Sequence, residues 1–491
     1  MKININEFRD KVHACWIGKN IGGTIGGPYE GAKEMLDIKG FSTPPNVVLP
    51  NDDLDLQLIW MEAVKRVGPK NINATVLGEF WISYITPYWN EYGRCKNNMI
   101  MGLVPPLSGD AFNEWKHSNG AWIRTEIWAC LAPGQPDIAL RYAYEDASVD
   151  HGMGEGTVSA IFTAALESAA FVETDLRKLI EVGLSKISAE SRTAKSVKCV
   201  LDCFDKGMDV VETRNKVFDM NSDLGNGWFE APSNIAYAVL GLLWGAGDFK
   251  KSMLYAVNCG DDTDCTAGLV GSVLGIIGGT KAIPEDWRDH IGDEIVTVAI
   301  ADGVLSARAS TCSQLTNDIL KYAPIMLCEN NANVELTDGN TEIDDNVYER
   351  MYGIKKEDEI YYPKMPYSCR IDFNYASAIV MYGGEPSIAP NETKKIKIRF
   401  VNNIPTYGNK QYYLKFRFLP ADGFEVKGPK AMFLSRWSPF DIDFYHDKPF
   451  CEAEFEITAP NSVEAKNTVV IEAIAEGRVT PAYIPITFLG V

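Results

Sequence analysis

The sequence predicts a large all-α domain followed by a small all-β sandwich domain, and two changes along the chain lead to this prediction. From residue 4 to about residue 328, apolar residues recur at three- and four-residue steps, the period of amphipathic helices. From residue 347 onward they alternate with polar residues, the period of half-buried strands. A length of 491 residues is also too great for one ordinary core and favours two or three domains.

The helical part is rich in alanine and glycine, as close packing between helices requires. Helices are expected in residues 8–23, 54–68 and 160–171, and loops such as GGPYEG and LAPGQPD separate such segments. The longest apolar runs, residues 236–247 and 267–279, contain glycine and are shorter than the ~20 residues of a membrane span. We therefore expect buried helices and no membrane partner.

A polar, asparagine-rich segment, residues 329–346, predicts a linker between a helical domain of residues 1–328 and a β domain of residues 347–491. The alternating segments of the β domain are IKIRFV, YYLKFRFL, CEAEFEITA and NTVVIEAIAEG. Several short strands at this spacing, with turn sequences such as PADG and APNS between them, favour an antiparallel β-sandwich.

Composition excludes some classes of function. The formal net charge of −19 makes nucleic acid a poor partner, since phosphate binding requires a basic surface. The N-terminal residues lack the continuous apolar block of a signal peptide, and the 11 cysteines include no C-x-x-C pair. We therefore expect a cytoplasmic protein whose thiols are reduced and mostly buried.

Two acidic clusters stand at the starts of expected helices. In the first, NDDLD, an N-cap and the helix dipole explain one or two acids, but three adjacent acids raise each other's pKa unless a cation lies between them. In the second, GDDTDCT, the spacing fits neither an EF-hand nor a zinc site, and hard oxygen ligands of this kind suit Mg²⁺, Mn²⁺ or Ca²⁺. If the two helix starts face each other, their carboxylates share one pocket, as in a two-metal hydrolytic site.

Two further loops contain glycine beside chemically useful side chains. In GGTIGGPYEG, Glu30 follows Pro28 in a forced bend, and a helix C-cap followed by a turn is the simpler interpretation of this stretch alone. In HSNGAWIRTEIW, Asn119 and Gly120 predict a tight turn whose backbone N–H groups could hold a phosphate. Such turns are also common without a ligand.

Taken in this order, the motifs resemble those of the ADP-ribosylglycohydrolase family. GGTIGGPYE is similar to the family's G-D-A-L-G-x-P-x-E, with Gly23 in place of the aspartate, and NDDLD resembles T-D-D-T. SNGAWIR resembles G-N-G-A-x-x-R, DASVDHGMGEG stands where the family has a histidine motif, and GDDTDCT is similar to G-G-D-T-D-T. The resemblance covers roughly Phe8 to Gly279 and leaves the β domain outside.

The resemblance implies an all-α bundle with a cleft that holds two Mg²⁺ ions, and hydrolysis of the bond between C1 of an ADP-ribosyl group and its acceptor. The metal ligands it implies are Asn51, Asp52, Asp53, Asp262, Asp264 and, less suitably, Cys265. The catalytic residues it implies are Glu30 and Asp53. The substrate-binding residues it implies are Asn119, Gly120, Ala121, Trp122, Arg124 and His151.

This sequence also departs from the family pattern. Asn51 and Leu54 replace the threonines of T-D-D-T, and Cys265 stands where a threonine ligand is usual, although a thiol suits Mg²⁺ poorly. The D-T-D-C form and the added β domain resemble a bacterial branch whose substrates need not be ADP-ribosylated. Trp122 could stack on a sugar or base, although core packing is the more frequent role.

Three hypotheses about function follow. The preferred one is a metal-dependent hydrolase of a glycosidic bond to an ADP-ribosyl or similar ribosyl group. The second is a glycoside hydrolase acting on a carbohydrate or nucleoside unrelated to ADP-ribose, and the third is a non-catalytic, crystallin-like or ligand-binding protein. The expected partner is a sugar or other small-molecule substrate, and a homodimer is possible.

Overall fold

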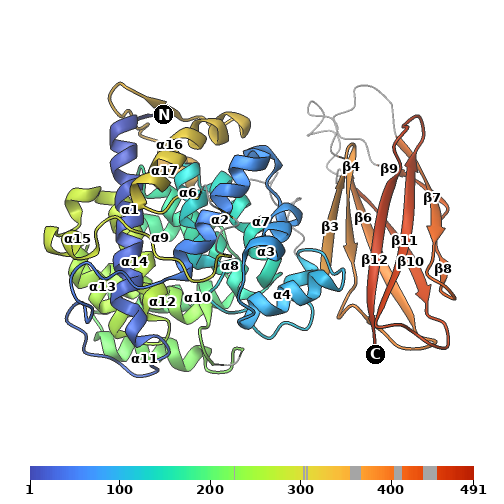
Figure 1. Ribbon diagram of the computed structural model, residues 1–491, viewed down its shortest axis with the longest axis horizontal. Coiled ribbons are helices and arrows are strands. Elements are labelled where there is room, and N and C mark those ends of the chain that lie inside the picture. The colour runs from blue at the N-terminus through green and yellow to red at the C-terminus, as the bar shows by residue number, and fades with distance from the viewer. Residues whose placement is uncertain (226, 302–304, 306–307, 354–365, 403–411, 435–449) are drawn as a thin grey trace. The chain divides into compact units, whose positions relative to one another are not determined.

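The computed structural model describes residues 1–225, 227–301, 305, 308–353, 366–402, 412–434 and 450–491. The predicted change from helices to strands along the chain is confirmed (Figure 1). The chain divides into two compact units. A helical unit comprises the described residues of Met1–Gly93 and Glu114–Glu359, and a β unit comprises those of Arg94–Asn113 and Ile360–Val491.

The helical unit consists mainly of helices, joined by loops of varied length. The helices are α1 (Ile5–Gly26), α2 (Asp52–Val67), α3 (Ala74–Tyr84), the first turn of α4 (Asn90–Ile100), α6 (Glu126–Leu131), α7 (Pro136–His151), α8 (Glu155–Ala169), α9 (Leu176–Ser185), α10 (Arg192–Asp205), α11 (Val210–Asn221), α12 (Ala231–Gly245), α13 (Phe249–Asn258), α14 (Thr263–Gly278), α15 (Glu285–Ile291), α16 (Cys312–Glu329) and α17 (Val347–Met351). Among the described helices, none is both long enough and apolar enough to cross a membrane.

Helices α1 and α14 pack against each other through glycine. A Cβ on Gly18 would overlap the backbone of Gly271, and a Cβ on Gly22 would overlap the backbone of Gly268. Since the earlier glycine of α1 meets the later glycine of α14, the two helices are antiparallel. Their labels lie close together in Figure 1. This close contact brings the end of α1 beside the start of α14, where Asp264 lies.

The start of α2 is fixed by its own side chains. Asn51 is the N-cap, and its Oδ1 accepts a hydrogen bond from the backbone N–H of Asp53 at 2.8 Å. One turn further, Asp55 Oδ2 accepts from the backbone N–H groups of Val298 (2.7 Å) and Ala299. Asn51 and Asp55 therefore stabilise the local backbone. Asp52 and Asp53 do not take part in these backbone contacts.

The β unit contains two five-stranded sheets, of order β3-β4-β6-β10-β8 and β5-β12-β11-β7-β9. The predicted segments all form strands, within β6, β7, β10 and β11. One hydrophobic core contains side chains from both sheets, such as Phe400 and Ile471. The strand bounds are β3 (Ser368–Phe373), β4 (Ala376–Met381), β5 (Ser387–Ile388), β6 (Thr393–Asn402), β7 (Tyr412–Leu419), β8 (Glu425–Lys427), β9 (Ala431–Leu434), β10 (Phe450–Thr458), β11 (Lys466–Ala475) and β12 (Ala482–Gly490).

The two units differ in extent from the predicted domain limits. Residues 94–113, which include most of α4 and all of α5 (Leu107–Asp110), belong to the β unit, because Leu103 and Leu107 are buried in its core. The predicted linker contains the short strand β2 (Glu335–Thr337), which pairs in parallel with β1 (Lys2–Asn4). Local patterns did not predict either feature, because each depends on a partner far away in the sequence.

Candidate metal centre and substrate pocket

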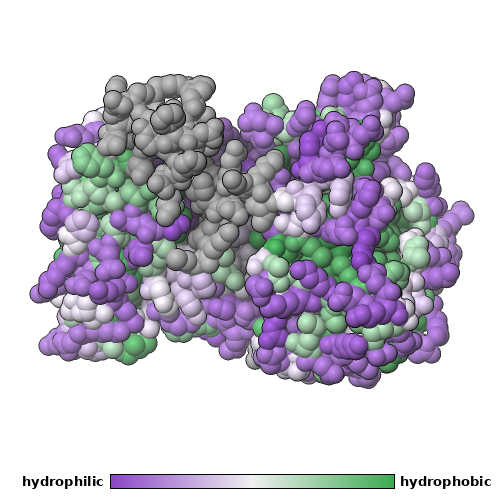
Figure 2. All heavy atoms as spheres, turned by 180° about the vertical axis from the view of Figure 1, so that it is seen from behind, coloured by the Kyte–Doolittle hydropathy of each residue, from purple (hydrophilic) through white to green (hydrophobic). Residues whose placement is uncertain are grey.

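A pocket with a volume of about 660 Å³ opens in the helical unit, a size suited to a small-molecule ligand. The predicted site residues that line it are Glu30, Asn51, Asp52, Asn119, Gly120, Asp262, Asp264 and Cys265. The other predicted residues, Asp53, Ala121, Trp122, Arg124 and His151, are buried and lie outside this lining. The space-filling view shows mostly hydrophilic side chains on one face of the molecule, with hydrophobic ones mainly in recesses of the helical unit (Figure 2).

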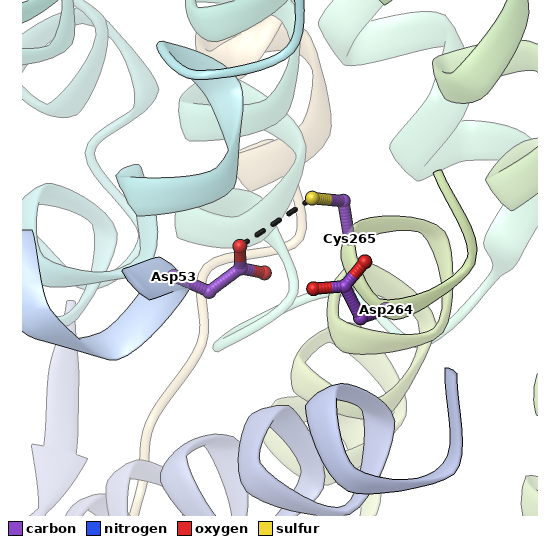
Figure 3. Close-up of side chains that lie close together, drawn as sticks. All are labelled: Asp53, Asp264 and Cys265. Atoms are coloured by element: carbon purple, nitrogen blue, oxygen red, sulfur yellow. Dashed lines mark hydrogen bonds between the residues drawn. The ribbon is translucent and has the colours of Figure 1, made fainter. Parts of the chain in front are cut away.

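The starts of α2 and α14 face each other, so the two acidic clusters meet. Figure 3 shows Asp53 from α2 opposite Asp264 and Cys265 from α14, with Cys265 Sγ donating to Asp53 Oδ1 at 3.4 Å. Ligand atoms of these three residues lie within 4.8 Å of one another. Ligand atoms of Glu30, Asp262 and Asp264 form a second group of the same size.

The second group fits a hard divalent cation. Asn119 Nδ2 donates to Asp262 Oδ2 at 2.6 Å, but Asp262 Oδ1 and Asp264 Oδ1 are buried and accept no hydrogen bond from the described residues. Buried carboxylate oxygens without a partner are costly, and a cation removes that cost. With Glu30 they form an all-oxygen donor set of the kind that Mg²⁺, Mn²⁺ and Ca²⁺ prefer.

The charge of these carboxyl groups is poorly balanced within the protein. Burial raises the pKa of Asp52 to about 6, and the charge of Asp53 adds to the shift. Burial also raises the pKa of Asp53 to about 7, although Lys19 opposes this shift. At the pocket rim, desolvation and then the charge of Asp264 raise the pKa of Glu30 to about 8. A bound cation would lower all of these pKa values.

Lys19 is a part of the site that sequence reasoning missed. Its ammonium group is fully buried and lies 3.0 Å from Asp53 Oδ2 and 2.9 Å from Glu126 Oε1. Burial alone would lower the pKa of Lys19, but these two carboxylates raise it overall, so the side chain is charged. A lysine inside the mostly apolar stretch CWIGKNIGG was the signal available in the sequence.

The loop with Asn119 and Gly120 is held in one conformation. Asn119 Oδ1 accepts from Trp122 Nε1 at 2.8 Å while its Nδ2 binds Asp262, so its side chain links the loop to the acidic cluster. A Cβ on Gly120 would overlap the carboxylate of Glu91. A larger residue at this position would displace the Glu91 side chain, and glycine leaves the loop backbone open to the pocket.

Arg124 supports this loop from its buried side. Its guanidinium donates to Asp146 (2.9 Å) and Asp150 (2.7 Å) and also to the carbonyl oxygen of Gly120. The side chain is fully buried, as are those of Trp122 and Ala121 beside it. The two aspartates that pair with the guanidinium were not singled out from the sequence, because their spacing along α7 has no distinctive pattern.

His151 contacts the pocket wall through another side chain. Its Nε2 lies 3.1 Å from Ser118 Oγ, and Ser118 lines the pocket together with Glu91. Burial raises the pKa of Glu91, which lies close to His151. Sequence reasoning missed Ser118 and Glu91, since a single serine and a single glutamate in a helix carry no signal.

The replacement of the family's aspartate by Gly23 also has a structural explanation. A Cβ at this position would overlap the side-chain amide of Asn51, which fills the space next to the α1 backbone. Glycine at position 23 and asparagine at position 51 are therefore compatible with each other, while an aspartate at position 23 would collide with Asn51.

The fold and the site together are those of a helical bundle whose pocket is lined with carboxylates that could hold a cation. The chain belongs to the ADP-ribosylglycohydrolase family, whose family model matches residues 4–314. An uncharacterized protein of Archaeoglobus fulgidus is 20% identical over 300 residues, which cover 58% of this chain and 93% of that protein. A solved structure described as an ADP-ribosylglycohydrolase-related protein complex is 20% identical, with a TM-score of 0.45, over 65% of this chain and 99% of that chain.

Proposed function

We propose that the chain is a metal-dependent hydrolase that cleaves a glycosidic bond to an ADP-ribosyl or similar ribosyl group. Membership of a family of glycohydrolases supports the reaction class. The observation that carries the proposal is a pair of buried oxygens, Asp262 Oδ1 and Asp264 Oδ1, which have no hydrogen-bond partner in the part of the chain that the structure describes and belong to residues that line the same pocket as Glu30. Buried carboxylates of this kind destabilise the metal-free fold, and a bound cation would remove that cost.

Each side chain has a role in this proposal. A Mg²⁺ ion held by Glu30, Asp262 and Asp264 would supply Lewis acidity and a grip on sugar hydroxyl groups. Glu30, which is exposed at the rim, takes the proton of the attacking water. Asp52, which lines the pocket, stabilises the positive charge that grows at C1 in an oxocarbenium-like transition state.

A second candidate is hydrolysis of a glycoside or nucleoside unrelated to ADP-ribose. The position of Arg124 favours it, because this guanidinium is buried and paired with Asp146 and Asp150. It is therefore not available to bind a diphosphate in the pocket. The candidates differ in substrate and share the carboxylate chemistry described above.

The test is a hydrolysis screen with ADP-ribosyl-arginine, ADP-ribosyl-serine, nucleosides and aryl glycosides, each with and without a chelator. Chelator-sensitive release of the acceptor from an ADP-ribosyl substrate supports the first candidate, and release only from a glycoside or nucleoside supports the second. Turnover of none of these substrates, together with no bound divalent ion, would favour a non-catalytic binder.

Glu30→Gln is expected to lower turnover roughly 10²- to 10⁴-fold, since it removes the proton acceptor while it keeps an oxygen ligand. Glu79→Gln is the matched control, because Glu79 is exposed on α3 and does not line the pocket. Equal activity of Glu30→Gln and wild-type protein would remove Glu30 from the proposed mechanism.

The cellular compartment, the form of the β unit and the oligomeric state belong to the same proposal. The cysteines are free, which supports a reducing, cytoplasmic environment. We also propose that the two sheets of the β unit form a β-sandwich, and that the added unit marks a bacterial branch of the family. Sedimentation of the purified chain would test whether it forms a homodimer.

A further inference from the structure

The inner side of the carboxylate cluster already contains a fixed positive charge. Lys19 Nζ lies between Asp53 Oδ2 and Glu126 Oε1, at 3.0 and 2.9 Å, and all three side chains are fully buried. Glu126 is held in turn by Gln57 Nε2 at 2.9 Å and Ser272 Oγ at 3.1 Å. These contacts from α1, α2, α6 and α14 leave the ammonium group little freedom to move.

Both carboxylate oxygens of Asp53 face protein groups, one of them through an ion pair. Its Oδ2 faces the ammonium of Lys19, and its Oδ1 accepts from the thiol of Cys265 (Figure 3). The group formed by Asp53, Asp264 and Cys265 therefore contains one carboxylate that is already paired and one sulfur, a soft ligand that hard divalent ions bind poorly.

We call Glu30, Asp262 and Asp264 the outer group and Asp53, Asp264 and Cys265 the inner group. The outer group differs in each of these respects. Glu30, Asp262 and Asp264 offer oxygen atoms only, and two of those oxygens, Asp262 Oδ1 and Asp264 Oδ1, have no hydrogen-bond partner among the described residues. Asp262 and Asp264 are also at least nine-tenths buried. The outer group needs a bound cation, whereas the ammonium of Lys19 already lies beside the inner group.

We propose that this chain binds a single divalent cation, through Glu30, Asp262 and Asp264, and that Lys19 supplies at Asp53 the positive charge that a second ion would otherwise supply. A second divalent ion beside Asp53 would be repelled by the ammonium, which is fixed by two carboxylates. This inference rests on the proposed function, which requires a cation, and adds the number of ions and a positioning role for Lys19.

The first test measures stoichiometry on the purified full-length chain, made metal-free with a chelator and titrated with Mn²⁺ by calorimetry. One Mn²⁺ per chain, with the electron paramagnetic resonance spectrum of an isolated ion, is expected. Two Mn²⁺ per chain with an exchange-coupled spectrum would overturn the inference and leave the proposed function intact. No bound Mn²⁺ would overturn both.

The second test changes the inner group. Lys19→Met, which removes the charge, is expected to raise the stoichiometry to two Mn²⁺ per chain, whereas Lys19→Arg retains a charge and is expected to stay at one. A folded Lys19→Met protein that still binds one ion would overturn the role of Lys19.

Cys265→Thr keeps the test decisive if Lys19→Met does not fold. It introduces a hard hydroxyl ligand and leaves Lys19 in place, so one Mn²⁺ per chain is expected. A second ion in this variant would show that the thiol, rather than the ammonium, excludes it, and would overturn the inference. Circular dichroism establishes that each variant is folded before titration.

Discussion

Helices α2 and α14 both begin with acidic residues and meet at one pocket, yet their acids have different partners. At the start of α2, Asn51 caps the helix, Asp53 pairs with Lys19, and Asp55 binds the backbone at Val298. Both helix starts contain buried carboxylate oxygens with no hydrogen-bond partner among the described residues, but Asp53 Oδ2 faces the ammonium of Lys19, whereas Asp264 forms no ion pair with a lysine or arginine among these residues. An acidic helix start therefore indicates a cation site only where no lysine, arginine or backbone N–H group of the protein balances the charge of its carboxylates.

The largest effect that this comparison predicts is on Asp264. Asp264→Asn removes the charge shared by both groups of ligands, so we expect divalent-ion affinity to fall about 100-fold or more and turnover to fall with it. Thermal unfolding of the metal-free protein should occur at the same or a higher temperature, since a neutral amide replaces a buried carboxylate with an oxygen that has no hydrogen-bond partner among the described residues. Mn²⁺ calorimetry and a thermal melt measure the two quantities; unchanged affinity would contradict the assignment.

The pH dependence of stability tests the charge imbalance. Because the pKa values of Asp52 and Asp53 are raised in the folded state, to about 6 and about 7, the folded protein binds more protons than the unfolded chain between about pH 4 and pH 7. The metal-free protein should therefore lose stability as pH rises through this window.

Added Mg²⁺ should offset that loss by binding at Glu30, Asp262 and Asp264, whose pKa values burial also raises in the metal-free protein. At roughly 100 times its Kd it should stabilise the fold by about 2.7 kcal/mol at pH 7.5, and by much less at pH 5, where protons compete for the carboxylates. Thermal unfolding at both pH values with Mg²⁺ or with chelator measures this difference. Equal stabilisation at the two pH values would contradict the raised pKa values.

The features that could be predicted from the sequence are those with a local pattern. The period of three to four residues, the period of two in β6, β7, β10 and β11, and the glycines of α1 and α14 all follow from short-range rules. Glu30, Asn119 and Asp262 were expected near a site because their motifs resemble those of the ADP-ribosylglycohydrolase family, and all three line one pocket.

The remaining features depend on contacts between distant segments. Lys19 gains its role from Asp53 and Glu126, which other helices supply, and its own neighbours in sequence suggest only a core helix. Arg124 was expected to bind substrate, but aspartates on α7 hold its guanidinium behind the loop. Residues 94–113 pack into the β unit through apolar side chains that would suit either core equally well.

Asp55 should matter for stability and for the shape of the pocket wall. Asp55→Ala leaves the N–H groups of Val298 and Ala299 without their acceptor, and we expect a loss of about 2 kcal/mol in the free energy of unfolding. Asp55→Asn keeps an acceptor oxygen and should lose less. Urea unfolding measures both, and Mn²⁺ stoichiometry should remain that of the wild type in each variant.

Substitution of Asn51 should have the smallest effect on stability. It also separates two roles of this residue, because Asn51 is both a helix cap and a candidate metal ligand. Asn51→Ala removes the acceptor for Asp53 N–H and should cost about 1 kcal/mol in the free energy of unfolding, whereas Asn51→Ser restores a capping oxygen and should recover most of it. Metal affinity should change only a few-fold in both variants, because the outer ligand group does not include Asn51. A large loss of Mn²⁺ affinity in Asn51→Ser, with stability restored, would instead make the amide oxygen a ligand and move the cation towards α2.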